Sequence, residues 1–285
     1  MSALTGIVHN LPEGEYHAHA ALSSTGARKI LESPARFNFW RSHPQEHKDV
    51  FDIGTAVHTK VLGAGSHIIE YPSEHLTPSG SASTKAATIE WVEYQRANGF
   101  VVISAAQARH VDGMAEAVLA HPVARTLLEQ NGNRREVSMF ATDPASGVEM
   151  RARFDLDADI SADLKTARDA SPKGFARAVT QHSYEVQQGW YQDVRELITG
   201  SRGKFQFIVA ESTAPYLVGV YELDYTFEDM GKVKALAARH IYRQCVDAFV
   251  WPGYSDTVTT LQPPQYAIYD YMDKFENDEP MNVGN

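Results

Sequence analysis

The sequence predicts a mixed α/β protein, with helices in its first half and a β-sheet in its second. Apolar residues recur at helical spacing up to about residue 130, and from Arg135 the pattern changes to the alternation that is typical of strands. The apolar fraction of 43% and the charged fraction of 22% are ordinary for a globular protein. We therefore expect one domain over residues 1–271, with a helical part (20–130), a sheet-based core (131–250) and a loose acidic tail at 272–285.

The helical part is divided by its capping and breaking residues. Ser23 or Ser24 can cap a first helix that continues to the break before Pro44, and Gly63 can end a second one. A proline disfavours helix at the residue before it, so the last helix of this part is expected to break at His121. The expected helices span residues 22–41, 51–63, 85–98 and 104–130, and 72–84 is expected to be a loop.

Strands are expected where apolar and polar residues alternate. Alternation places Met150, Ala152, Phe154 and Leu156 on one face of a strand, and Arg151, Arg153, Asp155 and Asp157 on the other. The next strand has Ser161, Asp163 and Lys165 on one face. One polar face thus collects carboxylates and a lysine. The expected strands span 135–143, 148–157, 160–166, 204–212 and 216–224, and the expected later helices span 172–181, 184–198 and 227–249.

The polar face suggests metal-assisted phosphodiester chemistry. A divalent cation bound by carboxylates neutralises the charge of a phosphate and activates a water molecule. Asp155 and Asp163 lie on strands joined by a short hairpin, so they can sit side by side, and Lys165 faces the same site. The same spacing also fits a solvated strand face that carries an Asp–Lys pair.

Four segments together resemble a known family. RARFD (151–155) followed by DLKT (163–166) resembles the PD-(D/E)xK signature as it occurs in exodeoxyribonuclease VIII-like (RecE-like) and RecB-like nucleases. GTAVH (54–58) resembles the helix that supplies their metal-binding histidine, and YEVQQGWY (184–191) resembles their YxxQxxxY element. Glu136 matches the acidic residue that precedes the signature strand. The resemblance implies a restriction-endonuclease-like core, in which a central mixed sheet is flanked by helices.

The resemblance also implies roles for individual residues. Asp155, Asp163 and the Leu164 carbonyl would hold one Mg²⁺, for which Mn²⁺ could substitute, and His58 and Glu136 would complete a second or shared position. Lys165 would assist the attacking water, and Gln187 would help to fix the scissile phosphate. Arg153 and Tyr191 are expected to contact DNA near the site. Apart from the resemblance, the geometry of a helix start suggests that Ser24, Thr25 and Arg28 could also contact DNA by holding a terminal phosphate.

Two departures from the signature leave an alternative open. Phe154 stands where the signature has proline, which is tolerable because the carboxylate supplies the chemistry. The short hairpin leaves Asp157 and Asp159 as rival ligands, although alternation favours Asp155.

The family implies a DNA exonuclease that degrades linear duplex from 5′ to 3′ and produces single strands for phage-type recombination, with a single-strand annealing protein as partner. The formal net charge of −10 opposes DNA binding by a monomer. A homotetrameric ring that turns its basic clusters inward would resolve this conflict.

Two other functions remain as alternatives. A nuclease fold can act as a catalytically silent DNA-binding scaffold. The pair His17 and His19 could belong to a phosphoesterase that acts on small molecules, although no carboxylate stands at metal-site spacing from it.

The sequence also indicates where the protein is found. No apolar run could span a membrane, the start does not read as a secretory signal, and Cys245 is the one cysteine. We therefore expect a cytoplasmic protein of a bacterium or phage.

Overall fold

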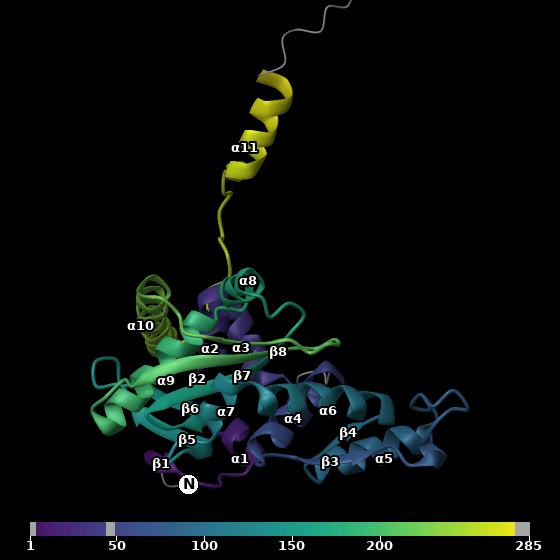
Figure 1. Cartoon of the computed structure of the whole chain (residues 1–285). Helices are drawn as coiled ribbons and strands as arrows, with labels where there is room; N and C mark the ends of the chain where they lie inside the picture. The colour runs from purple at the N-terminus through teal and green to yellow at the C-terminus, as the bar shows by residue number, and fades with distance from the viewer. Residues whose placement is uncertain (1–3, 44–48, 277–285) are drawn as a thin grey trace, which may run out of the picture.

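A computed structural model describes residues 4–43 and 49–276 (Figure 1). Its strands are β1 (Gly6–Val8), β2 (Leu22–Ser23), β3 (His67–Glu70), β4 (Phe100–Ile103), β5 (Arg134–Thr142), β6 (Glu149–Asp157), β7 (Ile160–Ala167), β8 (Lys204–Glu211) and β9 (Val218–Tyr221). Its α-helices are α1 (Glu13–Ala18), α2 (Ser24–Glu32), α3 (Pro34–Ser42), α4 (Asp49–Leu62), α5 (Ala86–Ala97), α6 (Ala105–Ala120), α7 (Pro122–Leu128), α8 (Pro172–His182), α9 (Tyr184–Thr199), α10 (Tyr225–Ala248) and α11 (Gln265–Tyr271).

The central sheet is mixed, as the sequence predicts. Its strand order is β1-β5-β6-β7-β8-β9, and β2 pairs with β6 beside this path. The strands β5, β6 and β7 form the expected antiparallel meander. β8 then runs parallel to β7, and β9 returns antiparallel to β8. This arrangement, with helices on both faces, confirms the predicted fold class.

Two apolar cores cover the two faces of the sheet (Figure 1). The first core packs α2, α9 and α10 against the sheet around the fully buried Trp190. The second core packs α4, α6 and α7 against the other face. Between the helices α9 and α10, Gly189 and Gly231 allow a close approach, because a Cβ on either glycine would lie under 3 Å from the other helix's backbone.

The prediction of one helix over 22–41 is wrong, because the structure has α2 and α3 there. Ser33 separates them in an extended conformation (φ −172°, ψ 124°) and caps α3 through its side chain. Pro34 is the cause, since it lacks an N–H and disfavours helical geometry at the preceding residue. The predicted end before Pro44 is confirmed, since α3 ends at Ser42.

The predicted helical part also contains strands. β3 and β4 form a separate parallel pair, and the small strands β1 and β2 join the main sheet. The expected break at His121 is confirmed, since its side chain caps α7 directly after α6 ends. The loop prediction for 72–84 holds except for a single helical turn at Ser73–His75.

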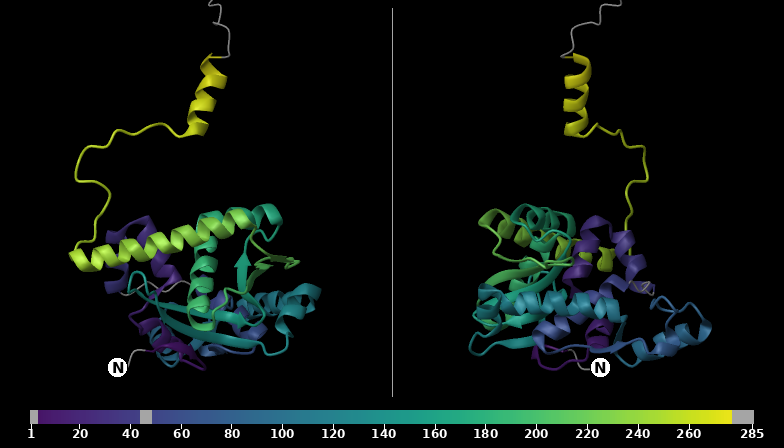
Figure 2. Two further views of the ribbon diagram at one scale, coloured as in Figure 1. Left: turned by 90° about the vertical axis from the view of Figure 1, so that its left-hand side faces the viewer. Right: turned by 45° about the vertical axis from the view of Figure 1, so that its right-hand side comes forward.

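The C-terminal segment leaves the body. Figures 1 and 2 show the chain running out from the end of α10 to α11, which stands apart from the sheet and its helices. A π-helical turn at Met272–Glu276 follows, where the loose tail was expected, and residues 277–285 lie outside the described part. None of the helices described is both long enough and apolar enough to cross a membrane.

Candidate metal centre

The centre begins where β5 and β6 face each other. The pairs Arg135↔Leu156 and Val137↔Phe154 place Glu136 directly opposite Asp155. Glu136 has φ of 51°, a left-handed conformation that is rare for a residue in a strand. Beside this point the predicted alternation fails, because Phe154 packs in the first core and Leu156 in the second. The expected single apolar face of this strand is therefore wrong at Leu156.

Asp155 also reaches the third strand of the meander. The pair Leu156↔Ala162 sets a register in which Asp155 is opposite Asp163. The backbone N–H of Leu164 donates a hydrogen bond of 2.7 Å to Asp155 Oδ2. The carboxylate is thereby fixed between the two strands.

His58 comes from the helix that covers the second face. It lies on α4, with Nδ1 at 3.3 Å from Asp155 Oδ2, and its side chain is 28% exposed. Gly54 is one turn earlier on α4 and faces β7, since a Cβ there would lie 4.0 Å from Thr166 Oγ1. The small residue lets α4 approach the strand, which brings His58 to the carboxylates.

His58, Glu136 and Asp155 have the geometry of a metal site. One ligand atom from each lies within 4.8 Å of the other two. Burial, together with the charge of Asp155, raises the pKa of Glu136 to about 8, and burial raises the pKa of Asp155 to about 6, against the opposing effect of His58. Crowded, partly desolvated carboxylates of this kind are stabilised by a cation, so these residues fit a divalent metal ion.

Asp163 and Lys165 form a second part of the centre. Lys165 Nζ forms an ion pair with Asp163 Oδ2 at 2.6 Å. This oxygen is buried, and it accepts no hydrogen bond from the described residues in addition to the ion pair. Gln187 links the two residues, donating from Nε2 to Asp163 Oδ1 (2.5 Å) and accepting from Lys165 Nζ (3.0 Å). The ammonium also lies 4.7 Å from the ring centroid of Tyr184, a contact that the sequence interpretation overlooked. Asp163 is not one of the three residues with metal-site geometry, and its buried Oδ2 is paired with the Lys165 ammonium.

The two rival aspartates lie elsewhere. Asp157 is completely buried and forms ion pairs with Arg134 and Arg195, which gives it a structural role. Asp159 is exposed in the turn between β6 and β7. Among the described residues, neither belongs to the group with metal-site geometry, and neither do His17 and His19.

Arg153 contacts the protein rather than an open surface. Its guanidinium donates to Ser138 Oγ (3.0 Å) and to the Leu11 carbonyl (2.7 Å), and lies 4.0 Å from Glu136 Oε2. The structure therefore brings Arg153 to the metal centre as a support for Glu136. Few N–H groups of the guanidinium remain free for the contact with DNA that the sequence predicts for Arg153.

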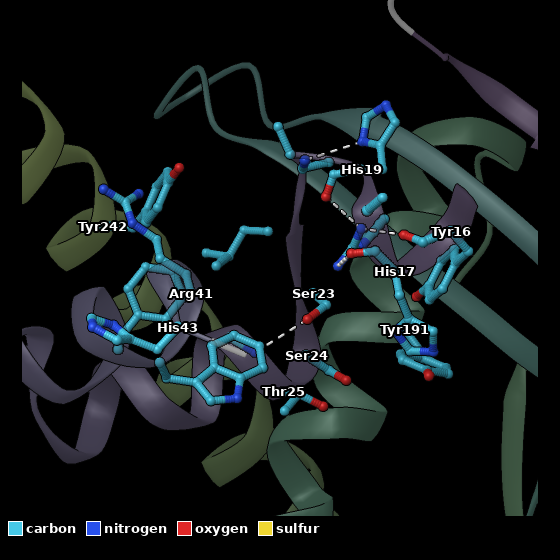
Figure 3. Close-up of a pocket in the computed structure, with 18 residues that line it drawn as sticks. Tyr16, His17, His19, Ser23, Ser24, Thr25, Arg41, His43, Tyr191 and Tyr242 are labelled. Atoms are coloured by element: carbon cyan, nitrogen blue, oxygen red, sulfur yellow. Dashed lines mark hydrogen bonds between the residues drawn. The ribbon is translucent and has the colours of Figure 1, made fainter. Parts of the chain in front are cut away.

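A pocket of about 790 Å³ is lined by Ser24, Thr25 and Tyr191 (Figure 3). Tyr191 links it to the centre, because burial raises the pKa of Tyr191 and the charges of Asp163 and Asp155 raise it further. Ser24 is 5% and Tyr191 8% exposed, and neither side-chain hydroxyl makes a hydrogen bond to a residue that the structure describes. Arg28 donates to Thr25 Oγ1 (3.1 Å) and to the His182 carbonyl (2.8 Å), and its buried Nε has no hydrogen-bond partner among the residues that the structure describes. The structure thus brings together the residues expected to hold a terminal phosphate. It adds an aromatic and basic wall, which the sequence interpretation did not single out: Tyr16, Phe37, Trp40, Arg41 and Tyr242.

Comparisons with known proteins agree with this geometry. A family model described as "PDDEXK-like domain of unknown function (DUF3799)" matches residues 23–263. A crystal structure described as a "Putative exonuclease" from Eubacterium rectale is similar in fold, with a TM-score of 0.58 and 13% identity over 95% of this chain and 100% of that chain. A structure of SSO0001 aligns with a TM-score of 0.24 and 14% identity over 75% of this chain and 84% of that one, which is too low to support an argument. No curated protein sequence matches the chain.

Proposed function

The chain belongs to the family of PDDEXK-like domains, and from this premise we propose that it is a divalent-metal-dependent nuclease that degrades DNA from an end. The observation that carries the proposal is the convergence of His58, Glu136 and Asp155 beside the Asp163–Lys165 pair. Carboxylates from adjacent strands next to a lysine are what metal-assisted phosphodiester hydrolysis requires.

Each residue has a distinct task in this proposal. Asp155, Glu136 and His58 would hold the metal ion, with Asp163 Oδ2 and the Leu164 carbonyl at its other side. A bound Mg²⁺ or Mn²⁺ would neutralise phosphate charge and lower the pKa of a water molecule. Lys165 would stabilise negative charge that develops on the phosphate, and Gln187 holds Lys165 and Asp163 in register. The imidazole in the ligand set suits Mn²⁺ better than Mg²⁺.

Three features support an exonuclease over an endonuclease. The neighbour in fold from Eubacterium rectale is described as an exonuclease. The pocket of about 790 Å³ that Tyr191 lines is the size of a drug-sized ligand site, which suits one strand end. The hydroxyls of Ser24 and Tyr191 form no hydrogen bond with a described residue, and they line this pocket close to the start of α2, where an anion is favoured.

The finer proposals come from the resemblance to exodeoxyribonuclease VIII-like nucleases. They are 5′ to 3′ digestion of linear duplex, a role in phage-type recombination, a single-strand annealing partner and a tetrameric ring. A solution mass of about four times 31.6 kDa would support the ring, and a monomeric mass would exclude it.

The proposed activity is tested with three substrates under the same conditions. The expected result is chelator-sensitive release of nucleotides from linear duplex, with no attack on covalently closed circular DNA or on nucleotide monoesters. Cleavage of the closed circle would indicate an endonuclease. Binding of DNA without any cleavage would indicate the silent scaffold, and attack on the monoesters alone would indicate a small-molecule phosphoesterase.

A further inference from the structure

The exposed face of α8 is basic in a chain whose net charge is −10. Lys173 and Arg177 are one helical turn apart, both are exposed, and neither forms an ion pair or a hydrogen bond with a described residue. α8 contains no acidic residue. Arg177 does interact through space with the nearby carboxylate of Asp169. Two exposed cations at this spacing still form a surface for an anionic chain, since a phosphate backbone presents charges at regular intervals.

The shape of this face also suits a nucleic-acid backbone. Lys173, Arg177 and Gln181 line an open groove of about 570 Å³ between α8 and Phe227 of α10. Its remaining lining side chains, Ala176 and Thr180, are small, so a chain could lie close to the helix. Two carboxylates lie near the start of α8, where Asp169 accepts a hydrogen bond from the Ser171 N–H and Glu211 accepts one from the Ala170 N–H. These bonds hold the two side chains at the N-terminal end of the helix, away from Gln181 at the other end.

The face leads to the metal centre. At the C-terminal end of α8, the carbonyl of His182 accepts a hydrogen bond from Arg28, and the His182 ring lies 5.4 Å from that of Tyr184. Tyr184 in turn contacts Lys165. A strand that reaches Lys165 past Tyr184 and His182 would continue along Gln181, Arg177 and Lys173.

We propose that the α8 face, defined by Lys173, Arg177 and Gln181, binds phosphates of the DNA strand that enters the metal centre. The inference rests on the proposed nuclease function and adds where the substrate lies outside the cutting site. It also explains how an acidic protein can hold DNA, because the positive charge is local.

The test compares two double variants that remove the same charge. Lys173→Gln/Arg177→Gln alters the α8 face, and the control Lys85→Gln/Lys232→Gln alters exposed lysines at the start of α5 and on α10. Binding of a fluorescent linear duplex is measured from 50 to 200 mM salt, with Ca²⁺ in place of Mg²⁺ to limit cleavage. Each lost phosphate contact should lower the slope of log affinity against log salt by about 0.9, so the α8 variant should lose roughly 1.8 and the control nothing.

The outcomes separate the two proposals. An unchanged slope in the α8 variant, or an equal change in both variants, would overturn the α8 inference even if the wild type cuts DNA. If the wild type binds duplex through α8 but shows no chelator-sensitive cleavage, the nuclease proposal fails and the α8 inference stands. A wild type that binds no duplex overturns both. Cleavage of a small phosphodiester, bis-p-nitrophenyl phosphate, should be the same in the wild type and both variants.

Discussion

Glu136 lies directly across from Asp155 in the β5–β6 pair, and its backbone adopts φ of 51° at that point. A left-handed conformation at a non-glycine residue costs on the order of 1–3 kcal/mol. Arg153 approaches Glu136 Oε2, and the two carboxylates face each other beside His58. The fold therefore holds two acidic groups together at a cost that a bound cation would offset.

This arrangement predicts a pH-dependent stability. The pKa of Glu136 is raised from 4.5 to about 8, so the folded protein binds this proton more tightly than the unfolded chain does. The metal-free protein should therefore lose stability as the pH rises from about 5 to 8. Melting temperatures in EDTA should fall over this range, and Glu136→Gln should remove much of the fall. The exposed Glu90→Gln serves as the control, and an identical pH profile in wild type and Glu136→Gln would contradict the assignment.

The Asp163–Lys165 pair predicts a loss of chemistry without a loss of fold. Asp163→Ala and Lys165→Ala should each lower the cleavage rate by about 10²-fold or more, because they remove charge that acts on the phosphate and the water. DNA binding should change little, and the melting temperature should fall without loss of the fold, because each variant leaves one member of the ion pair without its partner. Lys204→Ala, at the exposed start of β8, is the matched control. Digestion at the wild-type rate in either variant would refute the assignment.

The position of His58 beside Asp155 predicts that its removal raises the metal concentration needed for activity. His58→Ala removes the one imidazole near Asp155 in the described centre, so the Mg²⁺ or Mn²⁺ concentration for half-maximal activity should rise by roughly tenfold or more. The shift should be larger for Mn²⁺, which accepts nitrogen ligands more readily. His67→Ala, on the separate strand pair, should leave both titrations unchanged. If His58→Ala leaves them unchanged as well, His58 has only a packing role.

Asp155 and Asp157 predict opposite phenotypes. Asp155→Ala should abolish cleavage and leave the metal-free protein as stable as the wild type or more so, since it removes a carboxylate whose pKa burial raises. Asp157→Ala should leave cleavage near wild type at low temperature. It should cost about 3 kcal/mol of unfolding free energy, because Arg134 and Arg195 lose a buried partner. Urea unfolding and cleavage assays on the two variants measure this contrast, and the reverse pattern would show that the hairpin register is misassigned.

The sequence predicted the parts of the fold that depend on local pattern. The meander of β5 to β7 and the helices α4, α5 and α9 follow from regular apolar spacing. The break at His121 follows from Pro122, whereas the apolar spacing that continues over 22–41 predicts one helix in spite of Pro34. β3 and β4 were missed because four-residue strands give little periodic signal, and their pairing joins segments 30 residues apart.

The site was harder to predict where tertiary contacts override the pattern. Alternation placed Asp155 and Asp163 together, but it could not show that Leu156 turns to the second core or that Glu136 has a positive φ. Both features arise from the packing of two cores against one twisted sheet. The bonds of Arg153 to Ser138 and Leu11 likewise involve segments far apart in sequence, so an arginine expected to meet DNA instead lies beside Glu136.

The pocket beside the centre predicts recognition of a phosphorylated strand end. Ser24 and Tyr191 line it with hydroxyls that form no hydrogen bond with a described residue, and a hydrogen bond to a charged group contributes about 1.5–3 kcal/mol. The wild type should therefore digest duplexes with 5′-phosphate ends faster than those with 5′-hydroxyl ends. Ser24→Ala and Tyr191→Phe should each reduce this preference by roughly tenfold, while digestion of 5′-hydroxyl ends stays the same.

Tyr94→Phe, on the exposed face of α5, is the matched control for the hydroxyl that Tyr191→Phe removes. Because Tyr191→Phe keeps the ring that packs against Phe154, a loss of preference in this variant cannot come from a collapsed core. An undiminished preference in both variants would mean that the pocket binds another part of the strand.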